Sequence, residues 1–163
     1  MSPEYLVALA IDPMPEGAEY PAGVSLPLYC TMMHWFEGRK PMLDKILYPS
    51  LMLAACEPDE VELVSESATL FGPKNDVPCH LVKRTEELVL LHNRIFELLA
   101  KNDCLPEELR WVGAGWNPHV ADRGERSFPP GTKCFVDHLV LVRRGPNRAK
   151  VVVQSHEIGG IPF

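Results

Sequence analysis

Short apolar runs rich in β-forming residues alternate with two longer stretches of helical spacing, and this order limits the folds open to the chain. The runs predict strands because turn residues such as Asp-Pro or Gly-Pro bound them. In chain order the predicted strands cover residues 5–11, 28–36, 61–71, 77–83, 111–121, 134–143 and 149–155. The predicted helices cover residues 41–54 and 85–99.

The two helical stretches carry different start signals. Pro41 suits the first position of the earlier helix, and Pro49 is expected to kink or split that helix. Thr85 is the predicted N-cap of the later helix, and Glu86 suits its positive end. Clustered strands with two helices between them indicate an α+β domain. Because the halves have similar layouts, we expect one domain over residues 1–163 with a pseudo-duplicated, two-lobed sheet.

Composition argues against several classes of function. The chain has 163 residues and a formal charge of −6, so binding of duplex DNA through a large basic face is not expected. No apolar run reaches the roughly 18–20 residues that span a bilayer. The run at residues 6–11 follows Glu4 and ends at Asp12, unlike a signal peptide. Five cysteines without paired spacing predict free thiols, a cytoplasmic location and no metal site.

Two strings carry the candidate chemistry. They are LYCTMMHWF at residues 28–36 and GWNPHVADR at residues 115–123. Both resemble the signature strands of the two-histidine phosphoesterase superfamily, which includes 2′-5′ RNA ligase-like proteins and cyclic nucleotide phosphodiesterases. Members carry one His-x-Thr or His-x-Ser motif in each lobe, at roughly the interval seen here. The strand predicted at residues 5–11 and the strand pair after the second string fit the same pattern, so the resemblance covers nearly the whole chain.

The resemblance implies an α+β fold of two pseudo-symmetric antiparallel lobes around a central cleft, with helices on the outer faces. It also implies a phosphodiester reaction that uses neither metal nor cofactor. One imidazole takes a proton from the attacking oxygen and the other gives one to the leaving oxygen, which suits a side chain whose pKa is about 6.5. Side chains two apart on a strand share a face, so the hydroxyl of each motif can hold a phosphate oxygen in the same cleft. The implied ligands are cyclic or 2′-5′-linked nucleotides and RNA ends with a 2′,3′-cyclic phosphate.

The chain departs from this pattern at two of the four motif positions. Tyr29 stands at the first histidine position and Thr31 is retained; His119 is retained and Ala121 stands at the second hydroxyl position. Loss of one general acid or base typically costs about 10²–10⁴ in rate. We therefore predict a cleft lined by these four residues, with His119, Tyr29 and Thr31 as an impaired catalytic group.

Ligand contacts outside this group are also predicted. Trp116 is a candidate for stacking on a base, although core burial is the favoured alternative. Arg143 belongs to a compact basic patch near the sheet, so we place it with Trp116 and Ala121 as substrate-binding; a solvated hairpin end is the alternative. Strand alternation puts His34 on the face opposite Thr31 unless a bulge turns it.

The remaining four histidines have ordinary interpretations. His92 is expected on the partly exposed flank of the helix at residues 85–99. His80 and His138 are expected to be structural residues of strands, and His156 has no partner that the sequence identifies.

Three functions remain open from the sequence. One is a slow, metal-independent phosphodiesterase acting on small nucleotides or RNA ends. Another is a non-catalytic binder that sequesters such a nucleotide. The third is a protein-interaction scaffold with a vestigial cleft. The sequence identifies neither the base of the ligand nor the oligomeric state.

Overall fold

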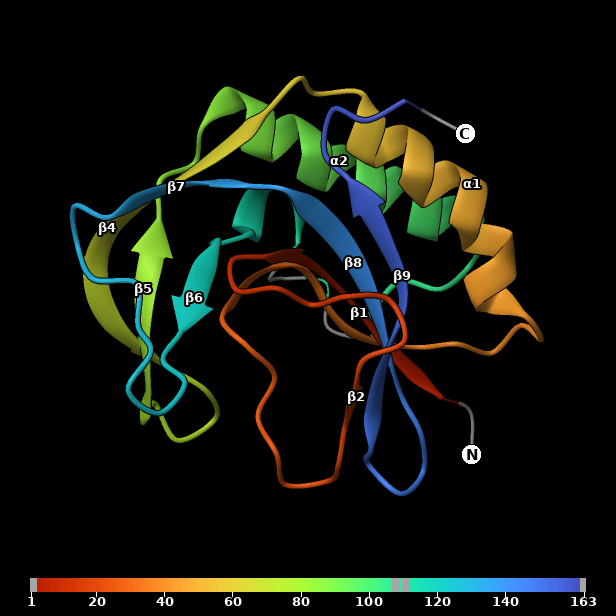
Figure 1. Cartoon of the computed structure of the whole chain (residues 1–163), viewed down its shortest axis with the longest axis horizontal. Coiled ribbons are helices and arrows are strands. Elements are labelled where there is room, and N and C mark those ends of the chain that lie inside the picture. The colour runs from red at the N-terminus through yellow and green to blue at the C-terminus, as the bar shows by residue number, and fades with distance from the viewer. Residues whose placement is uncertain (1–2, 107–108, 110–111, 162–163) are drawn as a thin grey trace.

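One curled sheet and two helices make up this computed structural model, which describes residues 3–106, 109 and 112–161 (Figure 1). The described strands are β1 (Glu4–Ala10), β2 (Glu19–Tyr20), β3 (Tyr29–Glu37), β4 (Val61–Phe71), β5 (Val77–Val82), β6 (His119–Ala121), β7 (Lys133–Val136), β8 (His138–Arg144) and β9 (Lys150–Glu157). The helices are α1 (Leu43–Cys56), α2 (Glu86–Lys101) and the short 3₁₀ turn η2 (Gly113–Gly115).

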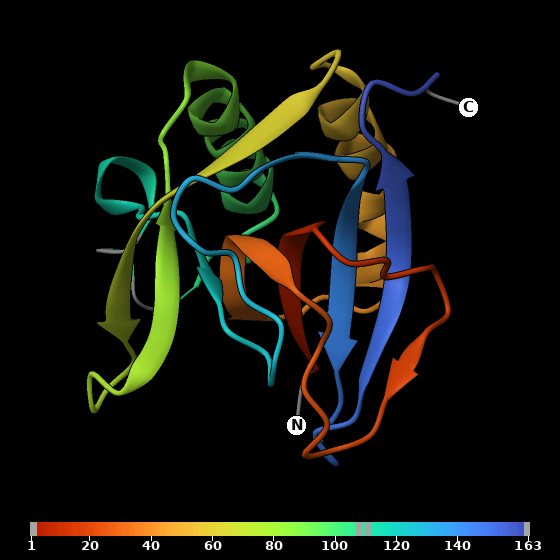
Figure 2. The ribbon, with the colours of Figure 1, turned by 60° about the vertical axis from the view of Figure 1, so that its left-hand side comes forward.

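The strands are hydrogen-bonded in the order β2-β9-β8-β1-β3-β6-β5-β4-β7. The registered pairs are antiparallel, and the two halves of the sheet meet where β3 and β6 share the single pair Cys30 and Val120. Figure 2 shows the strands of each half on either side of this junction. The α+β class is therefore confirmed, with the two predicted halves joined into one curved sheet.

Both helices pack on the same face of the sheet (Figure 1). Their buried side chains, which include Leu51 of α1 and Leu88 of α2, form one core with the β1 and β3 residues that point toward them. The opposite face of β1, β8 and β9 forms a smaller core, which is closed by Met14 and Leu26 of the long connection before β3. The middle of the sheet thus presents a concave face away from the helices.

The helix starts follow local backbone chemistry. The Thr85 hydroxyl accepts a hydrogen bond from the Leu88 amide at 3.3 Å, which confirms the predicted N-cap of α2. The first helix begins at Leu43, two residues after the predicted start, because Met42 has a left-handed φ of 58°. Pro49 lies within α1, which remains a single helix.

The second half of the chain differs most from the prediction. The strand expected at residues 134–143 is two strands, and β7 pairs with β4 while β8 pairs with β1. Of the strand expected at residues 111–121, only His119–Ala121 is extended, and η2 precedes it; residue 111 lies outside the described residues. The loop expected before residue 28 contains the two-residue strand β2, which pairs with β9.

Candidate functional site

The two motif strings meet at the centre of the concave face. Cys30 and Val120 are paired across β3 and β6, and both side chains are fully buried in the helix-side core. Because side chains alternate along a strand, their flanking neighbours point to the opposite, concave face. Those neighbours are the four predicted cleft residues Tyr29, Thr31, His119 and Ala121, and all four are half-buried.

A cavity of about 740 Å³ opens beside β6, and we call it the aromatic hollow. It forms where β3 and β6 diverge after their single shared pair. Thr31 and His119 line it together with Trp116 and with Phe71 from the β4–β5 hairpin. The Phe71 ring stacks on the His119 ring, with 4.3 Å between centroids. The hollow thus combines one imidazole, one hydroxyl and aromatic surface.

The protonation state of His119 follows from its hydrogen bond. Its Nδ1 lies 2.8 Å from the carbonyl oxygen of Asn117. A carbonyl oxygen only accepts, so Nδ1 carries the hydrogen and Nε2 keeps its lone pair in the neutral ring. Burial lowers the pKa of His119 below its ordinary value of 6.5, and the Arg123 charge acts in the same direction. At neutral pH the ring is therefore a hydrogen-bond acceptor and a potential base.

His34 also lines the aromatic hollow, contrary to simple strand alternation. Two irregularities in the pairing of β3 with β1 fall between Thr31 and Phe36. They place Met32 and Met33, which are consecutive, in the same helix-side core. The alternation is thereby shifted by one residue, and a second imidazole lies in the hollow.

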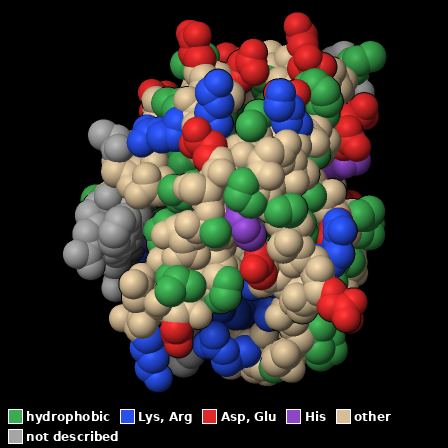
Figure 3. All heavy atoms as spheres, turned by 90° about the vertical axis from the view of Figure 1, so that its left-hand side faces the viewer, with side chains coloured by type: hydrophobic (Ala, Val, Ile, Leu, Met, Phe, Trp, Pro, Cys, Tyr) green, Lys and Arg blue, Asp and Glu red, His purple; other side chains and the backbone are tan. Residues whose placement is uncertain are grey.

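Tyr29 lines a second cavity of about 340 Å³, which we call the arginine pocket. Its Oη accepts a hydrogen bond from Arg123 Nη2 at 3.1 Å. The pocket is bounded by residues 23–26, Trp35, and the basic side chains of Arg123, Arg144, Arg148 and Lys150. In the space-filling view, Lys and Arg side chains gather around a hollow in the lower part of the face (Figure 3). Tyr29 and His119 therefore line different cavities.

Arg143, which the sequence predicted as a substrate-binding residue, lines neither the aromatic hollow nor the arginine pocket. Arg143 reaches toward α1, where its Nη1 lies 3.8 Å from Asp44 Oδ2. Arg144 is next along β8 and therefore points to the other face, where its guanidinium carbon lies 4.0 Å from the centre of the Trp35 ring. The predicted basic patch is therefore divided between the two faces of the sheet: Arg143 lies on the side of α1 and Arg144 on the side of the arginine pocket.

Trp116 is held against His92 of α2. The two rings are parallel within 2° and their centroids are 4.0 Å apart. His92 is fully buried: Nδ1 lies 2.8 Å from the carbonyl oxygen of Met32 and Nε2 accepts from the Gly113 amide at 2.9 Å. The partly exposed position predicted for His92 is wrong. This histidine ties α2 to β3 and to the turn that carries Trp116, so it supports one wall of the aromatic hollow.

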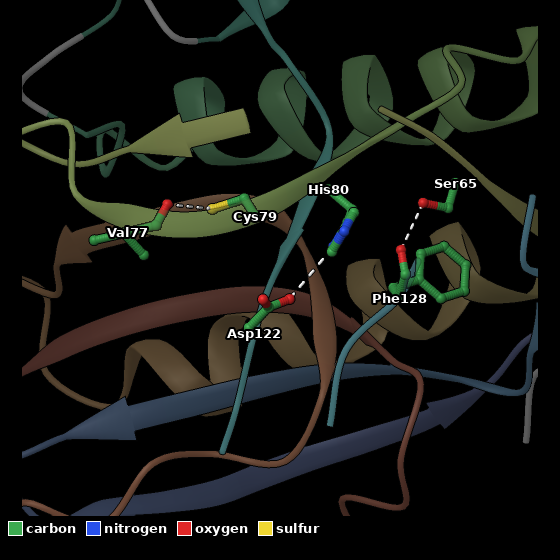
Figure 4. A network of polar contacts seen from close by, with 6 residues as sticks. All are labelled: Ser65, Val77, Cys79, His80, Asp122 and Phe128. Atoms are coloured by element: carbon green, nitrogen blue, oxygen red, sulfur yellow. Dashed lines mark hydrogen bonds and ion pairs between the residues drawn. The ribbon is translucent and has the colours of Figure 1, made fainter. Parts of the chain in front are cut away.

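His80 of β5 lies close to Asp122, the residue that follows β6 (Figure 4). Its Nδ1 lies 3.3 Å from Asp122 Oδ1. In the same view the Ser65 hydroxyl donates to the Phe128 carbonyl at 2.6 Å, which fastens the connection between β6 and β7. His80 lines neither the aromatic hollow nor the arginine pocket.

The cysteines and the other metal-ligating side chains give no further site. All five cysteines are free, and burial raises the pKa of Cys30 to about 12, so its thiol stays protonated. Among the described residues, no three His, Cys, Asp or Glu side chains are grouped closely enough to hold a metal ion. No described helix is both long and apolar enough to cross a bilayer.

Comparison with solved structures identifies the fold. The chain is similar to E. coli LigT complexed with 3′-AMP, at 14% identity and a TM-score of 0.61, over 97% of this chain and 99% of LigT. It is similar to TT0787 of Thermus thermophilus, at 17% identity and a TM-score of 0.59, over 96% and 98% of the two chains. A structure described as a phosphoesterase gives 15% identity and a TM-score of 0.60, over 97% and 99%.

No protein-family model and no curated protein matches the sequence. The structural matches nevertheless extend over almost the full length of each chain. The chain therefore has the fold of the two-histidine phosphoesterases, as the two motif strings predicted.

Proposed function

We propose that the concave face binds a small nucleotide through its phosphodiester or cyclic phosphate, and that this ligand is hydrolysed slowly at most. The observation that carries the proposal is that Thr31 and His119 share one hollow with the aromatic rings of Phe71 and Trp116. A hydroxyl and a protonated imidazole can donate hydrogen bonds to phosphate oxygens, and the half-buried Phe71 ring can stack on a base. The shared fold with E. coli LigT, whose structures include complexes with 3′-AMP, ATP and NADP+, supports a ligand of this class.

The chemistry of the hollow argues for slow turnover. Tyr29 stands at the position of the first histidine and is hydrogen-bonded to Arg123 in the other cavity. The second imidazole in the hollow belongs to His34, which lies three residues beyond Thr31 rather than two residues before it. Proton transfer from an unusual position is less well aligned with the leaving oxygen. We therefore expect any hydrolysis to depend on His119 and His34 and to tolerate Tyr29→Phe.

The setting proposed for this activity is the cytoplasm. Five free cysteines are consistent with a reducing compartment. A small nucleotide or an RNA end is the expected partner, and the net charge of −6 does not favour duplex DNA.

The test of binding is a thermal-shift screen with adenosine 2′,3′-cyclic phosphate, 3′,5′-cyclic AMP and 2′-5′-linked diadenylate. At least one of them should raise the melting temperature, because a ligand that binds only the folded state stabilises it. Thr31→Val should lower the affinity for that ligand by about tenfold or more, which is the effect expected when a hydrogen bond to a charged oxygen is lost. Thr69→Val makes the same chemical change on β4, outside both cavities, and should leave affinity unchanged.

Chromatography of each stabilising ligand then separates a slow enzyme from a binder. Slow consumption that His119→Ala abolishes identifies the enzyme, and stabilisation without consumption identifies the sequestering binder. If none of the three nucleotides stabilises the folded protein, the proposal is wrong and a scaffold role takes its place.

A further inference from the structure

The arginine pocket concentrates positive charge beside the proposed nucleotide site. Arg123 follows β6, Arg144 ends β8, Arg148 lies in the turn after it and Lys150 begins β9. No Asp or Glu is among the described residues that line the pocket. Four cations, one from the chain after β6 and three from the β8–β9 hairpin, thus surround a cavity of about 340 Å³.

Two of the arginines are fixed in place but incompletely bonded. The Arg144 guanidinium lies over the Trp35 ring at 4.0 Å and donates through Nη2 to Glu4 at 3.0 Å. The Arg123 guanidinium lies 5.3 Å from the centre of the Tyr29 ring and donates to its hydroxyl. The Nε atoms of both arginines are nevertheless buried without a hydrogen-bond partner among the described residues. A buried N–H donor without a partner is costly, and both arginines line the arginine pocket.

Of the four cations, Arg144 is paired with the carboxylate of Glu4, a residue that does not line the pocket. Lys150 Nζ donates to the Val24 carbonyl oxygen at 3.1 Å, and no carboxylate of the described residues is paired with it. Burial and the three neighbouring guanidinium groups lower the pKa of Lys150. Cations that repel one another in this way are stabilised together when an anion binds between them.

The pocket lies within reach of the aromatic hollow along β3. Tyr29 lines the pocket and Thr31 lines the hollow. Two residues of a strand span about 7 Å, so a single small ligand can contact both cavities. One end of a nucleotide would then lie against the arginines while its phosphodiester contacts Thr31 and His119.

We propose that the arginine pocket binds a terminal phosphate, so that the preferred ligand carries a phosphomonoester in addition to its phosphodiester. The pocket itself is an anion site whether or not a nucleotide binds. Its assignment to one end of a nucleotide rests on the proposed function. The ligand class is thereby narrowed to nucleotides phosphorylated at an end, such as a 5′-phosphorylated 2′-5′-linked diadenylate.

Calorimetric titration of matched ligands tests this inference. The 5′-phosphorylated 2′-5′-linked diadenylate should bind the wild-type protein at least tenfold more tightly than the same diadenylate without its 5′-phosphate. Arg144→Gln should reduce this ratio to below about threefold, since it removes one of the four cations that line the pocket. Arg148→Asn should also reduce it, and asparagine tolerates the left-handed φ of 64° at that position.

Arg143→Gln is the matched control, because it removes the same charge from the adjacent residue on the opposite face of β8. It should preserve the affinity ratio. A ratio near one in the wild-type protein, or a ratio that Arg144→Gln and Arg148→Asn both leave unchanged, overturns the inference.

Inorganic pyrophosphate separates this inference from the proposed function. It should bind the wild-type protein and bind Arg144→Gln at least tenfold more weakly, while Thr31→Val should not affect it. If neither diadenylate binds, but pyrophosphate binds the wild-type protein and Thr31→Val equally and binds Arg144→Gln more weakly, the nucleotide proposal fails and the anion site stands. If pyrophosphate does not bind the wild-type protein, the anion site is refuted.

Discussion

Changing Tyr29 to histidine and Ala121 to threonine together is expected to raise phosphodiester hydrolysis by about 10²-fold or more. A positioned general acid or base typically contributes about 10²–10⁴ in rate, and the added hydroxyl supplies one more phosphate contact. Both side chains start on the concave face of the strands that pair through Cys30 and Val120. The replacements therefore place the new imidazole two residues before Thr31 and the new hydroxyl two residues after His119, on the same face of their strands. The rate is measured with the nucleotide that binds best in the thermal-shift screen.

Two controls isolate the cause of this gain. Ala121→Thr alone should give a small part of the increase, because it adds no proton donor or acceptor of suitable pKa. Adding His119→Ala to the double variant should remove the gain. A folded double variant that is no faster than the wild type would show that Tyr29 and Ala121 do not occupy the two motif positions.

Replacing His92 by leucine is expected to destabilise the fold by about 2–4 kcal/mol at pH 7. The change leaves the Met32 carbonyl and the Gly113 amide without their buried partners, and each unsatisfied group costs about 1–3 kcal/mol. It also removes the ring that stacks on Trp116. Urea unfolding followed by circular dichroism measures the loss, and His138→Leu at the exposed start of β8 is the control.

His92 should also make the wild-type fold sensitive to acid. Burial lowers its pKa from 6.5 to about 4 in the folded protein, whereas the unfolded chain keeps the ordinary value. The unfolded state therefore binds the proton first, and stability falls as pH decreases from about 6.5 to about 4, by about 3 kcal/mol in total. Burial also lowers the pKa of His119 and His156, which add to the same trend.

The His92 contribution is the part of this pH dependence that His92→Leu removes. The free energy of unfolding of His92→Leu should therefore change less between pH 7 and pH 4.5 than that of the wild type. Equal pH dependence in the two proteins would contradict the buried, neutral assignment of His92.

Local pattern was sufficient for most elements, whereas the meeting of the two motif strings was predicted from the family resemblance. Alternation in short runs and the capped stripe of α2 depend on nearby residues, so the sequence predicted them. The His92 error was avoidable in part, because His92 lies four residues after Leu88 and three before Ile95, on the buried stripe of α2.

The positions of His34 and Arg144 could not be read from local pattern. His34 reaches the hollow through irregular pairing of β3 with β1, and a register shift of this kind is set by the partner strand. The tertiary structure decides which face of β8 is covered by α1, and therefore that Arg143 lies near α1 while Arg144 lies in the arginine pocket. The β6 strand is short because the chain before it turns through η2 to bury Trp116 against His92, a contact between residues far apart in the sequence.

The most direct test of nucleotide binding at the concave face is ¹⁵N NMR of the His119 ring, titrated with acid in the free protein and with saturating ligand. The free ring should have a pKa below 6.5 and carry its hydrogen on Nδ1. A bound phosphate should raise this pKa and shift Nε2, because a nearby anion favours the protonated ring. Affinity should accordingly weaken as pH rises from the free pKa to the bound pKa, and His119→Gln should lose this dependence. An unchanged His119 pKa and unchanged ring shifts with a saturating nucleotide would contradict binding at this site.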